Sequence, residues 1–258
     1  MNDPAKDNLI TLVAIGLVAY ASADIAHHAL GHGGACLSLG GSIISLSSIY
    51  VHCSLRGVVN DLGGPLANLL LGLAAALTAR IATRRSATTR LFLILAAAFN
   101  LLWFALQLVF SAASRTDDWA WAMHVFQVGE PVRYGMIALG ALAYLLTMRG
   151  IAVQMAAFAA SRVRARRIVM AAWITAGATA CATAALDPNA VSAIVHHALP
   201  QSIILSIGLL FVPRRASSLS SSAEPAGPIA FSVAWTVAAA LVGVASILLL
   251  GPGVAIAI

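Results

Sequence analysis

Long apolar runs separated by short polar segments dominate the pattern of this 258-residue chain. Seven runs are of the length that crosses about 30 Å of hydrocarbon as a helix, and none shows the alternation of a membrane β-strand. The fourth run is the shortest and the sixth contains two histidines, so six to eight spans fit the pattern. The runs occupy residues 9–35, 58–79, 91–112, 134–148, 168–186, 190–212 and 229–250.

Three segments interrupt this helical pattern. Residues 36–57 combine a Gly40-Gly41 turn signal with β-branched and aromatic residues, which predicts a short β-hairpin or re-entrant element after the first helix. Residues 149–167 carry a cluster of arginines and indicate a basic amphipathic helix on the membrane surface. Residues 216–228, rich in serine and alanine, predict a flexible polar linker.

The composition indicates that these hydrophobic helices belong to a membrane protein. The chain is 60% hydrophobic and only 9% charged, whereas soluble domains carry about 25% charged residues. We therefore predict an all-α polytopic membrane protein, formed as a single integral membrane domain over residues 1–258.

The formal net charge of +6 follows a topological pattern. In a seven-span arrangement, all of the 15 basic residues except Arg56, Arg115 and Arg133 lie on one side of the membrane. The positive-inside rule predicts that this side, with the N-terminus, is cytoplasmic. The charge is thereby explained without nucleic acid as a partner, and we expect the protein in a bacterial inner (plasma) membrane.

The three cysteines, Cys36, Cys53 and Cys181, form no CxxC pair. We interpret each as a small, buried apolar side chain. Because Cys36 and Cys53 flank one predicted loop, a disulfide between them stays open as the alternative.

Residues 24–32, DIAHHALGH, place polar side chains inside the first apolar run. On an α-helix, residues four apart share a face, so Asp24, His28 and His32 form one column and His27 is displaced by about 100°. Two imidazoles at i and i+4 converge on one zinc ion, which needs a third protein ligand. This pattern predicts a metal site, with hydrogen bonding between helices as the alternative.

Two downstream segments could complete such a site. The stretch NDLGGPLANLLLG at 60–72 opens the second span and places Asn68 about one turn inside the membrane, where polar groups bond between helices or function. The stretch SRTDDWAW at 114–121 closes the third span. One carboxylate from Asp117 or Asp118, reaching inward, would give a site of two histidines and one carboxylate.

The order of these motifs resembles the site-2-protease family of intramembrane zinc metalloproteases. That family carries HExxH on an early transmembrane helix, then a hairpin-like element, a GPxxN segment and a later aspartate. Here the order is HALGH at 28–32, a strand-like segment at 42–51, GPLAN at 64–68 and DW at 118–119.

This resemblance implies a role for each matching residue. His28, His32 and Asp118 would bind one Zn²⁺ per chain, and Asn68 would hold the backbone of a substrate. The resemblance covers residues 1–121, implied to be a metalloprotease-like core, whereas residues 122–258 add transmembrane helices. The partners implied are transmembrane proteins or peptides within membrane lipid.

Two positions depart from the family pattern. Ala29 stands where the family has the glutamate general base, and loss of a general base typically costs about 10²- to 10⁴-fold in rate. Asp24 lies one turn from His28, where it would orient that imidazole. The aspartate lies in DDW rather than in LDG or NPDG, so Asp117 competes with Asp118 as third ligand.

A second polar cluster, LDPNAVSAIVHHALPQS at 186–202, places His196 and His197 about two turns into the sixth span. These histidines, like His27, are candidate additional ligands or a replacement base, and hydrogen bonding between helices is the alternative.

Three functions stay open at this point. The first is a zinc protease, active or descended from active enzymes, and the second is a pseudoprotease that binds membrane proteins without cutting them. The third is a metal-ion or proton transporter lined by Asp24, His27, His28, His32, Asp61, His196 and His197.

Overall fold

The computed structural model describes residues 7–55, 57–81, 86–159, 161–218 and 225–255. Within these residues, seven helices are long and apolar enough to cross a membrane, which confirms the predicted polytopic helical class. They are Leu9–Ser38, Val58–Ile81, Ala87–Ser114, Glu130–Ala159, Arg162–Ala184, Ala190–Ala216 and Val233–Leu250.

Three of the spans change helix type along their length. The first consists of α1 (Leu9–Ile25), the π-helix η1 (Ala26–Gly33) and α2 (Gly34–Ser38). The seventh consists of α10 (Val233–Ala245) and the π-helix η5 (Ser246–Leu250). The sixth is divided into α8 (Ala190–Ala193), the π-helices η2 (Ile194–Ala198) and η3 (Pro200–Ile204), the 3₁₀-helix η4 (Ile207–Phe211) and α9 (Val212–Ala216).

The remaining spans are uninterrupted α-helices. They are α3 (Val58–Ile81), α4 (Ala87–Ser114), α6 (Glu130–Ala159) and α7 (Arg162–Ala184). A short helix, α5 (Asp117–Val125), connects α4 to α6.

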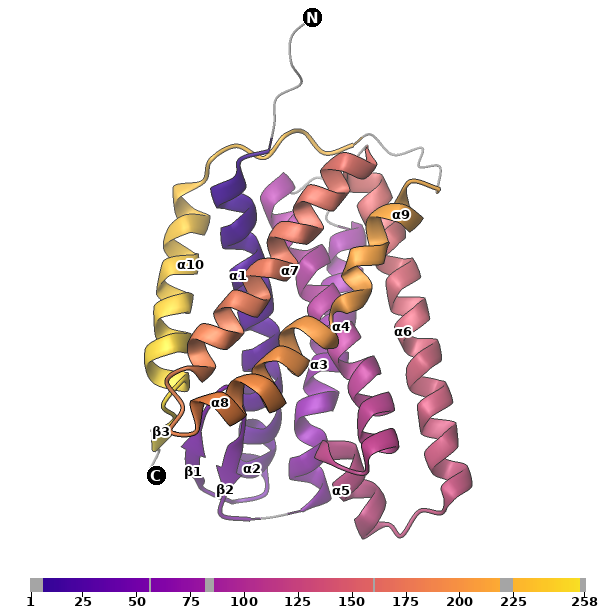
Figure 1. Cartoon of the computed structure of the whole chain (residues 1–258), viewed down its shortest axis with the longest axis vertical. Helices are drawn as coiled ribbons and strands as arrows, with labels where there is room; N and C mark the ends of the chain where they lie inside the picture. Colours follow the sequence, from indigo (N-terminus) through magenta and orange to yellow (C-terminus); the bar gives the residue numbers. More distant parts are fainter. Residues whose placement is uncertain (1–6, 56, 82–85, 160, 219–224, 256–258) are drawn as a thin grey trace, which may run out of the picture.

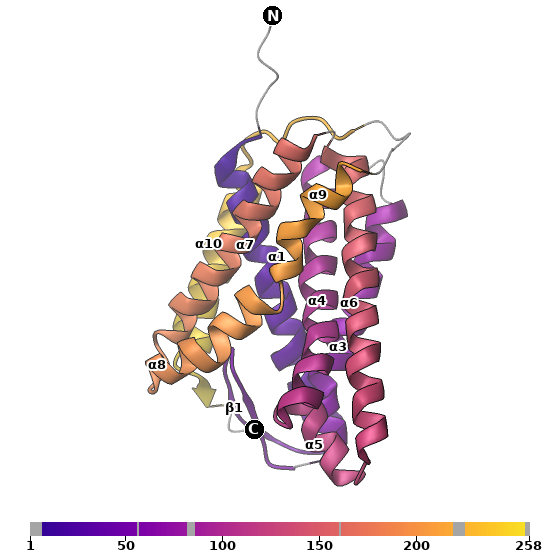
Figure 2. The same cartoon turned by 45° about the vertical axis from the view of Figure 1, so that its right-hand side comes forward.

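Helix α4 lies at the centre of the bundle, in contact with α1, α3 and α6 (Figure 1). On one side of it, α1 packs against α7 and α10 (Figure 2). Side chains of α4 such as Leu95 and Leu102 are almost completely buried, whereas Leu70 of α3 and Leu145 of α6 face outward. Outward-facing leucines suit a bundle whose surroundings are as apolar as its core.

The predicted hairpin is formed by β1 (Ile43–Leu46) and β2 (Val51–Cys53), which pair antiparallel with Leu46 opposite Val51. A third strand, β3 (Val254–Ala255), adds to β1 and gives the order β2-β1-β3. The sequence pattern gave no signal for β3. The sheet lies at the end of the bundle opposite the start of α1 (Figure 1).

The structure corrects the interpretation of two cysteines. Cys36 and Cys53 form a disulfide, which ties α2 to β2, so they are not separately packed thiols. Cys181 is a free, partly buried thiol.

The structure does not form a separate surface helix at 149–167. Helix α6 continues to Ala159, and α7 begins at Arg162 after Ser161, whose hydroxyl accepts a hydrogen bond from the Arg164 amide. Arginine is a good helix former and extends its charged head from a helix end, so the basic cluster lies within two long helices. Of the predicted linker, residues 225–228 have no regular secondary structure and residues 219–224 lie outside the described part.

An ion pair between partly buried Arg164 and buried Asp7 joins three segments at the basic end of the bundle. Arg164 donates from Nε and Nη2 to the two carboxylate oxygens of Asp7, at 2.9 Å each. The same guanidinium donates to the carbonyl of Gly227, and Asp7 accepts a hydrogen bond from the amide of Ile229. The start of α1, the start of α7 and the approach to α10 therefore meet at one guanidinium.

Replacing Arg164 by alanine should destabilise the folded protein by about 2–4 kcal/mol, because the carboxylate of Asp7 then stays buried without its partner. The measurement is thermal unfolding in detergent. Arg166→Ala is the matched control, since this arginine is exposed on the same turn of α7. Equal melting temperatures for both variants would contradict a structural role for the ion pair.

Candidate metal centre

The wide turns of η1 decide which histidines meet. A π-helix bonds residue i to residue i+5, so residues five apart lie on nearly the same face. The Nε2 atoms of His27 and His32 accordingly lie 3.2 Å apart, and both side chains are buried. The α-helical spacing assumed from the sequence had placed His28, not His27, above His32.

Asp118 joins this pair from the first turn of α5. Its Oδ2 lies 3.2 Å from Nε2 of His27 and 3.4 Å from Nε2 of His32. Gln107 of α4 donates from Nε2 to Asp118 at 2.8 Å and to Asp117 at 3.1 Å, which positions the first turn of α5. His27, His32 and Asp118 form the candidate metal centre of the described residues.

The three ligand atoms fit a tetrahedral zinc ion. Zinc bonds of about 2.0–2.2 Å at tetrahedral angles separate neighbouring ligand atoms by about 3.3–3.5 Å. The separations of 3.2, 3.2 and 3.4 Å approach this spacing. Two imidazoles and one carboxylate form a set of ligands suited to zinc, with one position of the tetrahedron left for a further ligand.

Neighbouring groups fix the orientation of both imidazoles. His32 donates from Nδ1 to the backbone carbonyl of Asn60 at 2.7 Å, which leaves its Nε2 free to bind a metal. The ring of His27 stacks on Trp103 with centroids 4.8 Å apart. Asn60 belongs to α3 and Trp103 to α4, whereas Asp118 belongs to α5. Helices α3, α4 and α5 therefore all contact the two histidines of η1.

Glycine is required where α3 crosses η1. A Cβ added at Gly64 would overlap Nε2 of His32 and lie 2.8 Å from Nε2 of His27. A Cβ at Gly31 would lie 2.5 Å from the Cα of Gly64. The Gly-Gly-Pro segment that begins the membrane-facing part of α3 therefore lets this helix approach the two imidazoles.

His28 is not part of the candidate metal centre, although its ring centroid lies 4.8 Å from that of His27. Its Nδ1 lies 3.2 Å from Oδ1 of Asp24, and its ring centroid lies 6.2 Å from that of His32. The structure thus places Asp24 beside His28, where the sequence had expected it, but brings His27 rather than His28 to His32. Ala29 follows on the same helix and is partly exposed.

The two neighbouring aspartates have different surroundings. Burial raises the pKa of the Asp117 carboxyl above its usual range, and the adjacent Asp118 charge adds to this. Burial acts in the same direction on Asp118, but hydrogen bonds from His27 and His32 outweigh it and hold the pKa of that carboxyl well below its usual range. Asp117 also adopts a left-handed backbone conformation with φ of 74°.

The other predicted site residues lie outside the three-residue group. Asn68 is completely buried in α3, and neither atom of its amide has a hydrogen-bond partner in the described residues. His196 and His197 have exposed side chains on η2. His197 is close enough to His28 to interact with it electrostatically.

No family model, curated protein or solved structure matches this chain. What the structure establishes is a membrane-helical protein with a buried His-His-Asp group that could hold a metal ion.

Proposed function

We propose that this protein is a membrane-embedded zinc protein of the intramembrane-metalloprotease kind, which acts on or binds peptide segments of membrane proteins. The observation that carries the proposal is the triangle of ligand atoms from His27, His32 and Asp118, with sides of 3.2–3.4 Å. The order of motifs along residues 1–121 supports the same assignment.

A groove beside the triangle offers room for a peptide. Its volume is about 590 Å³, and it is lined by residues of β2, α3 and α5, including Val51, Asn60 and Trp121. Asn60 is the residue whose carbonyl holds His32, so the groove lies next to the centre. β2 is the outer strand of the sheet, and an extended peptide can pair with such an edge.

When bound, a zinc ion would supply a Lewis acid for a peptide carbonyl. In the chain itself, Asn60 orients the imidazole of His32 and Gln107 orients the carboxylate of Asp118. Burial of both imidazoles excludes water from them. With His27 as first ligand, the residue that follows it is His28, which takes the position of the glutamate in HExxH. We therefore expect slow hydrolysis in the natural protein.

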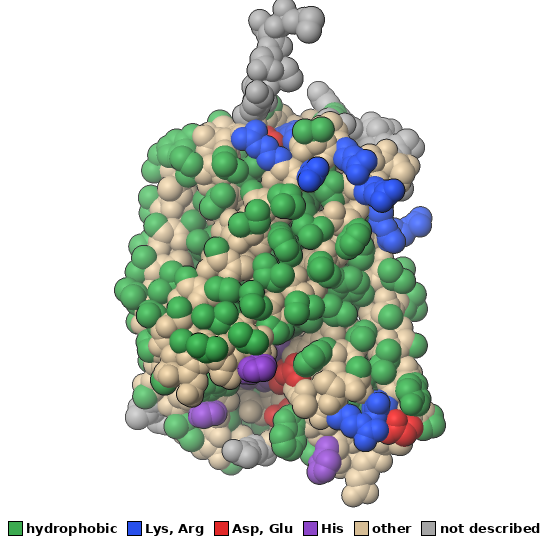
Figure 3. All heavy atoms as spheres, viewed as in Figure 1, with side chains coloured by type: hydrophobic (Ala, Val, Ile, Leu, Met, Phe, Trp, Pro, Cys, Tyr) green, Lys and Arg blue, Asp and Glu red, His purple; other side chains and the backbone are tan. Residues whose placement is uncertain are grey.

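The orientation in the membrane belongs to the same proposal. Arginine side chains gather at the end where α7 begins, whereas at the opposite end a smaller basic group lies beside acidic side chains and histidines border a hollow (Figure 3). The positive-inside rule assigns the basic end to the cytoplasm. The Cys36–Cys53 disulfide lies at the other end, which agrees with an oxidising compartment outside a bacterial inner membrane. Arg56 lies outside the described residues.

Metal analysis of the purified full-length chain tests this proposal. We expect about one zinc per chain after dialysis against metal-free buffer, because the site offers three protein ligands. A zinc content near zero would contradict it. As a second measurement, any cleavage of a transmembrane test peptide by the natural chain should be lost in Asp118→Asn, which removes a ligand of the triangle. Asp117→Asn is the matched control, and equal cleavage by both variants would contradict the assignment of Asp118.

A further inference from the structure

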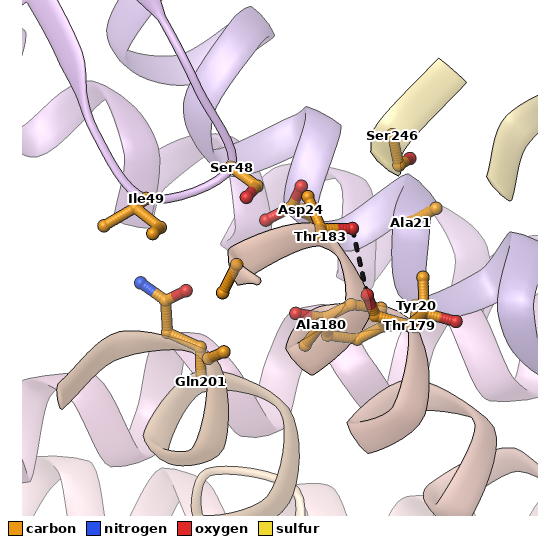
Figure 4. Close-up of a pocket in the computed structure, with 12 residues that line it drawn as sticks. Tyr20, Ala21, Asp24, Ser48, Ile49, Thr179, Ala180, Thr183, Gln201 and Ser246 are labelled. Carbon is orange, nitrogen blue, oxygen red and sulfur yellow. Dashed lines mark hydrogen bonds between the residues drawn. The ribbon is translucent and has the colours of Figure 1, made fainter. Parts of the chain in front are cut away.

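A second, smaller polar cavity lies beside Asp24, outside the candidate metal centre. Its volume is about 10 Å³, at the lower limit for one water molecule. The side chains that line it come from α1, α7, η2, η3, η5 and the turn between β1 and β2 (Figure 4). The polar ones are Tyr20, Asp24, Ser48, Thr179, Thr183, Gln201 and Ser246.

Asp24 brings a carboxylate to this cavity at membrane depth. The residue is 5% exposed, and its Oδ1 lies 3.2 Å from Nδ1 of His28 but accepts no hydrogen bond from the described residues. That Nδ1 hydrogen-bonds the backbone carbonyl of Asp24 instead, at 3.3 Å. A buried carboxylate oxygen without a hydrogen bond is costly in a medium of low dielectric constant, so the cavity favours a positive charge beside it.

The remaining polar groups are neutral oxygen donors. In Figure 4 the Asp24 carboxylate is drawn next to Ser48 and Thr183, and Ser246 lines the same cavity from η5. The hydroxyl of Thr183 donates its proton to the carbonyl of Thr179 at 2.9 Å, which leaves its lone pairs available. Carboxylate and hydroxyl oxygens are hard ligands, which suit alkali and alkaline-earth cations better than transition metals.

Irregular helices supply several of these donors. Ala198 belongs to η2, Gln201 to η3 and Ser246 to η5, whereas Asp24 lies in the last turn of α1. π-helical turns are rare and occur frequently at functional sites. Three separate π-helical segments therefore border one cavity that contains a buried carboxyl group.

We infer that this cavity binds a single sodium ion, with the Asp24 carboxylate as charged ligand and hydroxyl oxygens of Ser48, Thr183 and Ser246 around it. One carboxylate balances a monovalent ion, whereas a divalent ion would leave an uncompensated charge in the membrane interior. The cavity has room for one bare ion without its hydration shell, and the comparison of sodium with potassium salts tests the selectivity.

The test is thermal unfolding of the full-length protein in detergent, in NaCl, KCl or choline chloride at equal ionic strength. We expect the melting temperature to rise by several degrees with sodium and to saturate, because a ligand of the folded state stabilises it by mass action. Asp24→Asn should remove this response. Asp187→Asn, which changes a carboxylate outside the cavity, should retain it.

Binding of radioactive sodium to the natural chain in equilibrium dialysis gives a second measurement that needs no variant. About one saturable site per chain is expected, and Thr183→Val should weaken its affinity by about fivefold to tenfold through loss of one oxygen ligand. Identical melting curves in the three salts together with no saturable sodium binding would overturn the inference and leave a water molecule in the cavity. His32→Ala should lose zinc and keep the sodium response, so failure of the two sites is distinguishable.

Discussion

Replacing His27 by alanine should abolish zinc binding, whereas replacing His28 should leave about one zinc per chain. His27 contributes one corner of the ligand triangle, and a site reduced to two protein ligands loses affinity by about two orders of magnitude or more. His28 instead faces Asp24, outside that triangle. Metal content of both purified variants, after dialysis at the same free zinc concentration, measures the difference.

These two variants control for each other, because they delete the same side chain at adjacent buried positions. The aspartates allow a similar comparison: Asp118→Asn should lose zinc and Asp117→Asn should keep it. Asparagine tolerates the left-handed backbone at position 117, so that control is not expected to strain the chain. Loss of zinc in His28→Ala with retention in His27→Ala would mean that the segment binds metal as a regular α-helix.

Gly64→Ala should have the second large effect, although it changes no ligand. The added methyl group would overlap the Nε2 atom of His32 and press on His27, so α3 must move away from η1. We expect zinc affinity to fall by at least about 100-fold and the folded state to lose about 1–3 kcal/mol. Zinc titration and thermal unfolding of the same preparation separate the two effects.

Gly150→Ala is the matched control for this substitution. Gly150 also lies within a membrane-spanning helix, but a Cβ there meets no atom within 4 Å. Its zinc affinity should equal that of the natural chain. Unchanged zinc affinity in Gly64→Ala would contradict the close approach of α3 to the two imidazoles.

The positions of the helices could be predicted well because the membrane requires long apolar runs, whatever the details of packing. Predicted span ends differ from the structure mainly where charged residues continue a helix, as at Arg149 within α6. The hairpin at 43–53 could be predicted from its turn signal and β-branched residues. β3 could not, because two residues near the end of the chain pair with β1 only in the folded bundle.

At the candidate metal centre, the types of residue could be predicted, but which of these residues lie together could not. His32 and Asp118 were identified as a pair, but the change from α-helix to π-helix in η1 exchanges His28 for His27. No local sequence rule marks such a change in helix type. Gln107 was also missed, because an isolated polar residue in an apolar run does not show which neighbour it contacts.

The separation of the ligands along the chain has a consequence for biosynthesis. His27 and His32 belong to the first span, but Asp118 follows the third, and α3 and α4 both contact the region that holds it. The centre therefore cannot assemble until three spans have entered the membrane and α5 has docked. A metal ion held there would therefore be loaded late, and it would link η1 to a segment made two spans later.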